Sequence, residues 1–213
     1  MIRIKKSENV PQSLVRTTAY DGVDVQRQLL VDHHHKCYIC ECIVEANFHI
    51  EHLNSKNNNR QDWNNLFLSC GYCNVRKLGL FDDILNPTLH NVEDLIEQRI
   101  DTSTKTASFK SNDTSMAVTQ TIRLLERIFN GKDAESDSRN PHEEVFYDNV
   151  EMIINGFLKK AIDFCLDSSD TNMNCIKEEL NIDKELLGFK YWIIKDTPQL
   201  FAVFKDDIKW NKQ

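Results

Sequence analysis

The chain has 213 residues, of which 40% are hydrophobic, so it can form one large domain or two small ones around a buried core. No stretch approaches the roughly 18 apolar residues that a membrane span needs, and the N-terminal residues lack the apolar run of a secretory signal. These features argue against a membrane protein and predict a soluble, cytoplasmic one.

The net charge of −7 is distributed unevenly. Residues 1–80 carry 10 Lys and Arg against 8 Asp and Glu, whereas residues 81–213 carry 16 against 25. A small positive excess in the first part is weak for unaided binding of phosphate groups. We therefore expect a partner protein to make many of the contacts that bind a nucleic-acid substrate.

Two short elements are predicted ahead of a cysteine-rich block. Alternation of apolar and charged residues predicts a strand over residues 2–6. An acidic start followed by apolar residues predicts a capped helix over residues 21–30, with Val23 and the Leu29–Leu30 pair facing inward.

Four of the seven cysteines form two C-x-x-C pairs, Cys37 with Cys40 and Cys70 with Cys73. In a cytoplasmic protein such pairs indicate a metal rather than disulfides. Two tight turns that each present two thiolates complete a tetrahedral site, so we expect a structural Zn²⁺ that contributes directly to folding. The remaining three cysteines lack this spacing and are interpreted as incidental thiols: Cys42, Cys165 and Cys175.

The segment between the pairs is longer than in a simple zinc ribbon, with 29 residues in place of about 15–20. It has β character around residues 43–44 and 48–50 and a turn-rich loop at 55–60, and a short helix is expected over 72–78. The insert and the second pair also contain, in this order, residues able to do chemistry: Glu51, His52, Asn65, Asn74 and Lys77.

This order resembles the four-cysteine form of the HNH endonuclease motif, which has the ββα-metal fold. The residues that carry the resemblance are C-Y-I-C at 37–40, E-H at 51–52, N-L at 65–66 and C-G-Y-C-N-V-R-K at 70–77. It implies an α+β protein in which a ββα-metal HNH core with a structural zinc knuckle precedes a mainly helical C-terminal region.

The resemblance also implies roles for the four polar residues. His52 would be the general base that activates water, since imidazole accepts a proton near neutral pH, and Asn65 would orient it through a hydrogen bond. Glu51 and Asn74 would hold one catalytic Mg²⁺ or Mn²⁺ through oxygen ligands. The family more often has Asp at the position of Glu51, and Asn64 competes with Asn65, which is favoured because it directly precedes a leucine.

Basic residues near the motif are candidates for contacts to phosphate groups. These candidates are Lys77, Lys56 and Arg60. The histidines at 33–35 are interpreted as a solvated helix end, although one of them could replace a cysteine ligand. Asp82 and Asp83 are interpreted as a solvated acidic turn.

Beyond Pro87 the pattern becomes mainly helical. Apolar spacing predicts one strand near residues 107–110 and helices over these ranges: 91–100, 118–130 with Gly131 as its stop, 142–167, 173–181 and 183–195. Residues 132–141 are expected to form an exposed linker, and residues 201–204 are ambiguous. The chain is accordingly divided into an HNH nuclease domain over residues 1–87 and a mainly helical domain over residues 88–213.

The elements around the motif are also similar to those of the nuclease subunit of Septu-type antiphage defence systems (PtuB-like), which also accompany some retrons. The segments that carry this likeness are residues 36–41, 51–52, 63–66 and 81–87. It implies an SMC- or ABC-like ATPase partner that docks on the C-terminal helices. The chain itself has no G-x-x-x-x-G-K-[ST] sequence, so a partner would have to use the ATP.

The sequence therefore predicts a metal-dependent nuclease, with DNA favoured over RNA as substrate, that is the effector subunit of an ATPase-controlled antiphage complex. Two alternatives stay open. A stand-alone HNH endonuclease of restriction or mobile-element type predicts tight binding and cleavage by the chain alone. A zinc-stabilised nucleic-acid-binding module without activity does not require the four polar motif residues to occur together.

Overall fold

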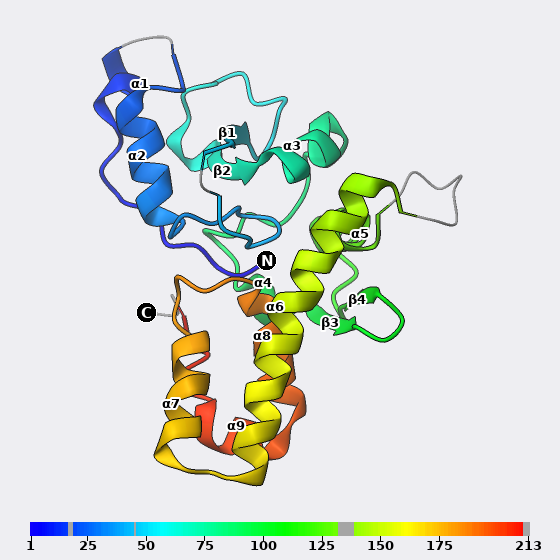
Figure 1. Cartoon of the computed structure of the whole chain (residues 1–213). Coiled ribbons are helices and arrows are strands. Elements are labelled where there is room, and N and C mark those ends of the chain that lie inside the picture. The colour runs from blue at the N-terminus through cyan, green and yellow to red at the C-terminus, as the bar shows by residue number, and fades with distance from the viewer. Residues whose placement is uncertain (17–18, 45, 132–138, 211–213) are drawn as a thin grey trace.

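The computed structural model describes residues 1–16, 19–44, 46–131 and 139–210. Over these residues the chain is a mixed α/β protein with two small antiparallel sheets and a mainly helical C-terminal region (Figure 1). This confirms the predicted α+β class at that level of detail. Within the same residues, no helix combines the length and the apolar character that a membrane span requires.

The N-terminal segment is extended but is not the strand predicted over residues 2–6. Ile2 packs into one apolar cluster and Ile4 into another, so their alternation reflects burial on two sides of an unpaired segment. The backbone N–H of Ile4 donates to the carbonyl of Pro87 at 2.9 Å.

The predicted N-terminal helix is present as α2 (Val23–Asp32), after a short α1 (Gln12–Arg16). Its buried residues are Val25 and Leu29, one turn apart. Val23 is 61% exposed, so the prediction that it faces inward is wrong. The helix begins directly after Gly22, and this start sets a phase that turns Val23 outward.

A hairpin followed by a helix occupies the centre of the N-terminal half. Strand β1 (Phe48–His52) pairs antiparallel with β2 (Leu66–Cys70), which is preceded by the 3-10 helix η1 (Trp63–Asn65). Helix α3 (Gly71–Lys77) follows β2 directly and leads into the 3-10 helix η2 (Leu78–Leu80).

The helix predicted over residues 91–100 is wrong in its second half. Helix α4 (Val92–Leu95) is short, and the chain then forms β3 (Glu97–Asp101), which pairs with β4 (Thr106–Lys110). This pairing satisfies the backbone from residue 97 onward. The strand predicted near residues 107–110 is confirmed.

The predicted long helices are present. Helix α5 (Met116–Asn130) ends at Gly131, whose φ of 73° lies in the region that favours glycine. Helix α6 (Pro141–Leu166) is followed by the last three helices: α7 (Asp170–Glu179), α8 (Leu187–Asp196) and α9 (Pro198–Phe204). Most of the predicted linker, at 132–138, lies outside the described residues.

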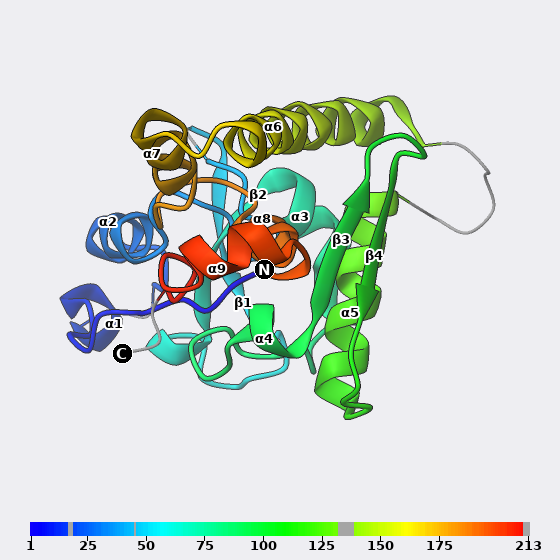
Figure 2. The ribbon, with the colours of Figure 1, turned by 90° about the horizontal axis from the view of Figure 1, so that it is seen from below.

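Among the described residues the buried apolar side chains form two clusters. The first joins the β1–β2–α3 unit to α5 and to Phe189 of α8, and the second lies among α6, α7, α8 and α9. Figure 2 shows the β3–β4 hairpin lying beside α5, with α6 running across the top of the view. The first cluster includes residues on both sides of residue 87, and the domain division there stays a prediction.

Candidate functional site

Helix α3 lies along strand β1 from one end to the other. At the start of the helix, a Cβ placed on Gly71 would lie 3.5 Å from Nε2 of His49. At its end, Lys77 Nζ donates to the carbonyl of His52 at 3.1 Å. Phe48 is opposite Cys70, and His52 is opposite Leu66. The hairpin therefore has a cysteine end and a histidine end, and α3 connects them.

The four predicted metal ligands come together at the cysteine end. The sulfur atoms of Cys37, Cys40, Cys70 and Cys73 all lie within 4.8 Å of one another. Cys40 Sγ and Cys70 Sγ are 3.8 Å apart, close to the roughly 3.8 Å that a tetrahedral zinc with Zn–S bonds of about 2.3 Å requires. This donor set fits a structural zinc ion, as the spacing predicted.

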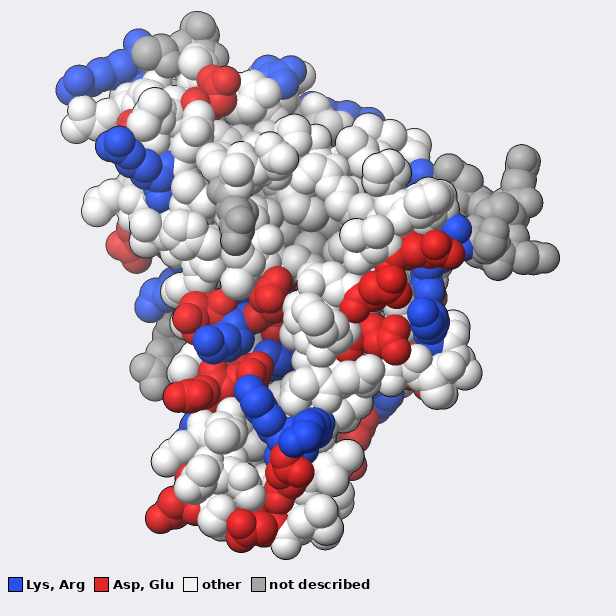
Figure 3. Space-filling model, viewed as in Figure 1, with Lys and Arg blue, Asp and Glu red and all other residues white. Residues whose placement is uncertain are grey.

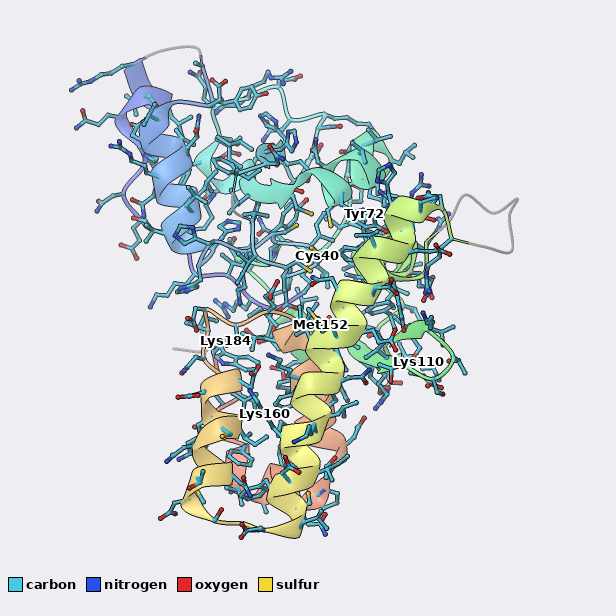
Figure 4. The ribbon with its side chains drawn as sticks, viewed as in Figure 1. Cys40, Tyr72, Lys110, Met152, Lys160 and Lys184 are labelled. Carbon is cyan, nitrogen blue, oxygen red and sulfur yellow. The ribbon has the colours of Figure 1, made fainter. Side chains whose placement is uncertain are left out.

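Each half of the cluster is tied to a different part of the molecule. Lys36 and Ile43 form a β-bridge that closes the turn of the first pair, and Tyr38 N–H donates to the carbonyl of Leu68 in β2 at 2.9 Å. Beside the second pair, Tyr72 stacks on Phe146 of α6 with ring centroids 4.1 Å apart (Figure 4). A metal at the cluster would thus join the turn of the first pair to β2 and α3, and Tyr72 connects α3 to the C-terminal helix α6.

Glu51 and Lys77 form a buried ion pair at the histidine end, with 3.2 Å between Glu51 Oε1 and Lys77 Nζ. Lys77 is 0% exposed, so the prediction that it contacts a phosphate group is wrong for this structure. Its ammonium instead neutralises a carboxylate that burial would otherwise penalise. Burial raises the pKa of Glu51 to about 7, against the opposing effect of Lys77. The other oxygen, Oε2, is buried without a hydrogen-bond partner among the described residues.

The His52 side chain is partly exposed, and its imidazole makes a hydrogen bond to the main chain. Its Nε2 lies 2.9 Å from the carbonyl oxygen of Arg60. Because a carbonyl oxygen only accepts, Nε2 carries the proton and Nδ1 presents a lone pair. Tyr20 packs edge-on against the imidazole, with ring centroids 4.7 Å apart. The contacts thus favour one tautomer, with Nδ1 as the proton acceptor.

The predicted polar residues do not all meet. Neighbouring residues of a strand point to opposite faces, so Glu51 faces Lys77 while His52 faces Tyr20. The side chain of Asn65 bonds to the main chain of Asn54 rather than to the imidazole. Its Oδ1 accepts from Asn54 N–H at 2.8 Å, and its Nδ2 donates to the Asn54 carbonyl at 3.0 Å. Asn65 therefore shapes the loop after β1.

Asn74 lies in the middle of α3, one turn before Lys77, and is partly exposed. Its side chain makes no hydrogen bond to the described part of the chain. Its neighbour in sequence, Cys73, is fully buried in the cysteine cluster. Asn74 thus offers an uncommitted amide oxygen on the helix that follows β2.

The loop after β1 carries the two other basic candidates, and both are exposed. Lys56 Nζ lies 3.5 Å from Asp82 Oδ2, and the Arg60 guanidinium lies over the ring of Tyr20 at 5.3 Å. Asp82 is not the solvated residue that was predicted. It is buried and accepts hydrogen bonds from the backbone and hydroxyl of Ser55. These bonds fix the position of the loop after β1.

The histidine run before the first cysteine pair also differs from prediction at one position. His33 is buried against Phe67, and neither ring nitrogen has a hydrogen-bond partner among the described residues. Burial, and after it the nearby Lys6, lowers the pKa of His33 to about 3. His33 is therefore a neutral core residue, and it is absent from the cysteine cluster.

Two aromatic residues of the site were not predicted from the sequence. Tyr20 packs on His52, and Tyr38 is buried near Glu51, which contributes to raising the Tyr38 pKa well above its usual value after the larger effect of burial. Tyr38 is the interior of a C-x-x-C pair, a position that gives some signal. Tyr20 lies 32 residues before His52 in the chain and has no local signal.

Comparisons with protein-family models, with curated proteins and with solved structures found no match to this chain. The site is therefore defined by its own geometry. It consists of a four-cysteine cluster fit for zinc and, at the other end of one hairpin, an oriented histidine.

Proposed function

We propose that this chain is a metal-dependent nuclease of the HNH type that hydrolyses phosphodiester bonds, with DNA as the expected substrate. In this proposal β1, β2 and α3 are the ββα-metal core, and His52 is the general base. The motif residues follow one another in the family's order, from the first cysteine pair through β1 and η1 to the end of β2 and α3, which supports the proposal.

The observation that carries the proposal is the hydrogen bond between His52 Nε2 and the carbonyl oxygen of Arg60. It leaves Nδ1 with a lone pair on a partly exposed ring, which is what a base needs to take a proton from water. A histidine with a purely structural role would usually be buried, as His33 is. His52 instead is partly exposed, with Nε2 bonded and Nδ1 without a hydrogen bond to the described residues.

Two metals have separate tasks in the proposal. Zn²⁺ at the cysteine cluster is the scaffold, while a catalytic Mg²⁺ or Mn²⁺ would take oxygen ligands from Glu51 and Asn74. The unpartnered Oε2 of Glu51 and the uncommitted amide of Asn74 are hard oxygen donors of the kind this cation prefers. When bound, the metal polarises the phosphate and stabilises the leaving oxygen. His52 takes the proton from water, and Asn65 keeps the adjoining loop in place.

One observation favours the alternative of a zinc-stabilised binding module without activity. The ammonium of Lys77 already neutralises Glu51 at 3.2 Å, and the carboxylate is only 8% exposed. A divalent metal would have to share that carboxylate with Lys77. Exposed Lys56 and Arg60 would serve nucleic-acid binding equally well in either case.

We further propose that the nuclease works as a subunit of an ATPase-controlled antiphage complex. The acidic surplus of residues 81–213 and the weak positive charge of residues 1–80 support a need for help in binding nucleic acid. The outer face of α6 is a candidate docking surface (Figure 1).

A cleavage assay tests the proposal, with Mg²⁺ or Mn²⁺, on labelled duplex DNA, single-stranded DNA and tRNA, and with and without a co-encoded ATPase. Loss of a general base typically costs about 10²–10⁴-fold in rate, so His52→Ala should reduce cleavage by at least about 100-fold. Zinc content and thermal stability should stay those of the unsubstituted chain.

The matched control is His49→Ala, since His49 is an exposed histidine of the same strand. It should retain cleavage within a few-fold. Equal cleavage by the His52→Ala and unsubstituted chains would remove the proposed base. Binding without any cleavage under all conditions would support the binding module, and cleavage without the ATPase would support a stand-alone endonuclease.

A further inference from the structure

A recess of about 360 Å³ lies between α6, α7 and the segment that leads into α8. Its volume falls within the range of pockets that hold small ligands. Only Ile43 comes from the cysteine-rich block, so the recess is separate from the β1–β2–α3 unit. Its lining combines charged with apolar or small residues: Lys160, Lys184, Lys190, Glu179 and Glu185, with Ile43, Met152, Ile153 and Gly156.

We propose that this recess binds a small organic phosphate, of the size and chemistry of a nucleoside monophosphate. The phosphate would contact the ammonium groups of Lys160 and Lys184, with the buried Lys190 adding positive charge behind them, and the organic part would lie against the apolar wall. Figure 3 shows Lys and Arg side chains gathered with Asp and Glu side chains beside α6 and α7. In Figure 4, Met152 and Lys160 lie on α6, and Lys184 lies across from them.

Among the described residues, the charges of the lining leave one cation, Lys184, without an ion-pair partner. Lys160 and Lys190 share the carboxylate of Glu179, at 2.5 and 2.7 Å. The carboxylate of Glu185 accepts the backbone N–H of Ile43 at 2.8 Å. The ammonium of Lys184 has neither an ion pair nor a hydrogen bond with any residue of the described ranges. A bound anion would give the ammonium of Lys184 an ion-pair partner.

Lys160 and Lys184 also have N–H donors that make no hydrogen bond to the described residues. Each ammonium has three N–H donors. Lys160 uses one on Glu179, and the buried Lys190 uses two, on the carboxylate and the carbonyl of that residue. Phosphate oxygens accept several such bonds at once, which makes phosphate a suitable ligand for a cluster of this kind.

The apolar wall indicates that the ligand has more than a phosphate group. Met152 is 67% exposed and Ile43 is 49% exposed, although both line a recess. A Cβ placed on Gly156 would meet nothing within 4 Å, so the wall of α6 is hollow at that point. The ion pairs of Glu179 alone, which hold α6, α7 and α8 together, require neither the hollow nor Lys184.

The recess adjoins the segment that supports the first cysteine pair. Lys36 Nζ donates to the carbonyls of Ile182 and Lys184, at 2.6 and 2.7 Å. A ligand on Lys184 would thus contact a segment that is bonded both to the cysteine block and to the C-terminal helices. We expect ligand binding to raise the melting temperature of the whole zinc-loaded chain.

Isothermal titration of the zinc-loaded full chain with AMP, adenosine and inorganic phosphate tests the proposal. AMP should bind more tightly than either of its parts. Lys184→Ala should weaken AMP binding by about tenfold, as expected for loss of a charge-assisted hydrogen bond. Gly156→Leu should abolish binding by filling the hollow, while leucine suits a helix better than glycine and preserves the fold.

The matched control is Lys159→Ala, because Lys159 is an exposed lysine of the same helix that pairs with Asp163 at 3.0 Å. It should leave the affinity for AMP unchanged. The proposal is overturned if AMP does not bind at millimolar concentration, if Lys159→Ala and Lys184→Ala weaken binding equally, or if Gly156→Leu binds normally. Binding of inorganic phosphate as tightly as AMP would overturn the organic-phosphate assignment.

Discussion

The region around β1, β2 and α3 and the region of helices α6 to α9 are held together in different ways. The first has short regular elements and buries several polar groups, among them four cysteines and the Glu51–Lys77 pair. The second consists of helices, the longest of them α6, whose buried residues are mostly apolar, and Asn140 caps the start of α6. Each region should therefore respond differently to a single substitution.

A two-stranded hairpin and a seven-residue helix have little stability of their own. They depend on interactions between residues distant in sequence, such as a shared metal or a buried ion pair, whose loss affects several elements at once. A helix such as α6, with 26 residues, spreads its stabilisation over many apolar contacts. Polar substitutions should thus cost much in the first region and, apart from the pairs of Lys160 and Lys190 with Glu179, little in the second.

Loss of the metal should have the largest effect. Structural zinc contributes on the order of 10 kcal/mol to the folding of small sites, so Cys70→Ser or chelation should unfold the hairpin region. Hydrogen exchange should show lost protection in β1, β2 and α3 before α7 and α9. Metal analysis should show less zinc.

Cys165→Ser is the control, because Cys165 is an exposed cysteine outside the cluster. It should leave zinc content and exchange unchanged. Uniform loss of protection in both regions after Cys70→Ser would show that they fold as one unit. That result would contradict the contrast between a metal-dependent hairpin region and an independent helical region.

The buried ion pair should give the next largest effect. Removal of one partner of a buried pair leaves an uncompensated charge and typically costs about 3–5 kcal/mol, so Lys77→Ala should lower the free energy of unfolding by up to this amount above pH 7, because the pKa of Glu51 is about 7 and the group can take up a proton at lower pH. Denaturant titration of the zinc-loaded chain measures it. Lys56→Ala should cost less than about 1 kcal/mol, because that lysine is exposed. Equal costs for the two variants would contradict a structural role for Lys77.

His33 should make the first region sensitive to acid. Because burial lowers its folded-state pKa to about 3, the folded state binds fewer protons than the unfolded state as the pH falls below about 6.5. Stability is thus complete above the unfolded pKa and is lost on acidification, by about 2 kcal/mol between pH 6.5 and pH 5.

His33→Leu should remove that part of the pH dependence, as denaturant titrations at both pH values would show. Acid release of zinc affects both proteins, so the difference between them reports His33. His90→Ala, at an exposed histidine, should behave like the unsubstituted chain. A His33→Leu variant as acid-sensitive as that chain would contradict a neutral buried imidazole.

The comparison also explains what could be predicted from the sequence. Local patterns predicted the cysteine cluster from two C-x-x-C pairs, and α5 from the helical spacing of residues such as Val118 and Leu125 with Gly131 as stop. The C-terminal half of the predicted helix at 91–100 is instead a strand, since pairing with β4 is a tertiary interaction that overrides local spacing.

The candidate site was predicted less completely than the fold. The burial of Lys77 depends on Glu51, 26 residues earlier, and on the strand alternation that points Glu51 and His52 to opposite faces. The contact of Tyr20 with His52 likewise joins residues distant in sequence. A motif predicts which residue types occur, but the partner of each side chain is set by how β1, α3 and the intervening loop pack.

The smallest effect is expected in the helical region, at the start of α6. The side chain of Asn140 accepts from the backbone N–H groups of His142 and Glu143, and Glu143 bonds back to the Asn140 backbone. Loss of such a cap typically costs about 1 kcal/mol, so Asn140→Ala should lower the free energy of unfolding by that amount. Ser169 precedes α7 without a side-chain cap hydrogen bond, so Ser169→Ala should cost less. If Asn140→Ala instead cost as much as Lys77→Ala in denaturant titration, polar contacts would be as critical in the helical region as in the hairpin, and the contrast between the two regions would not hold.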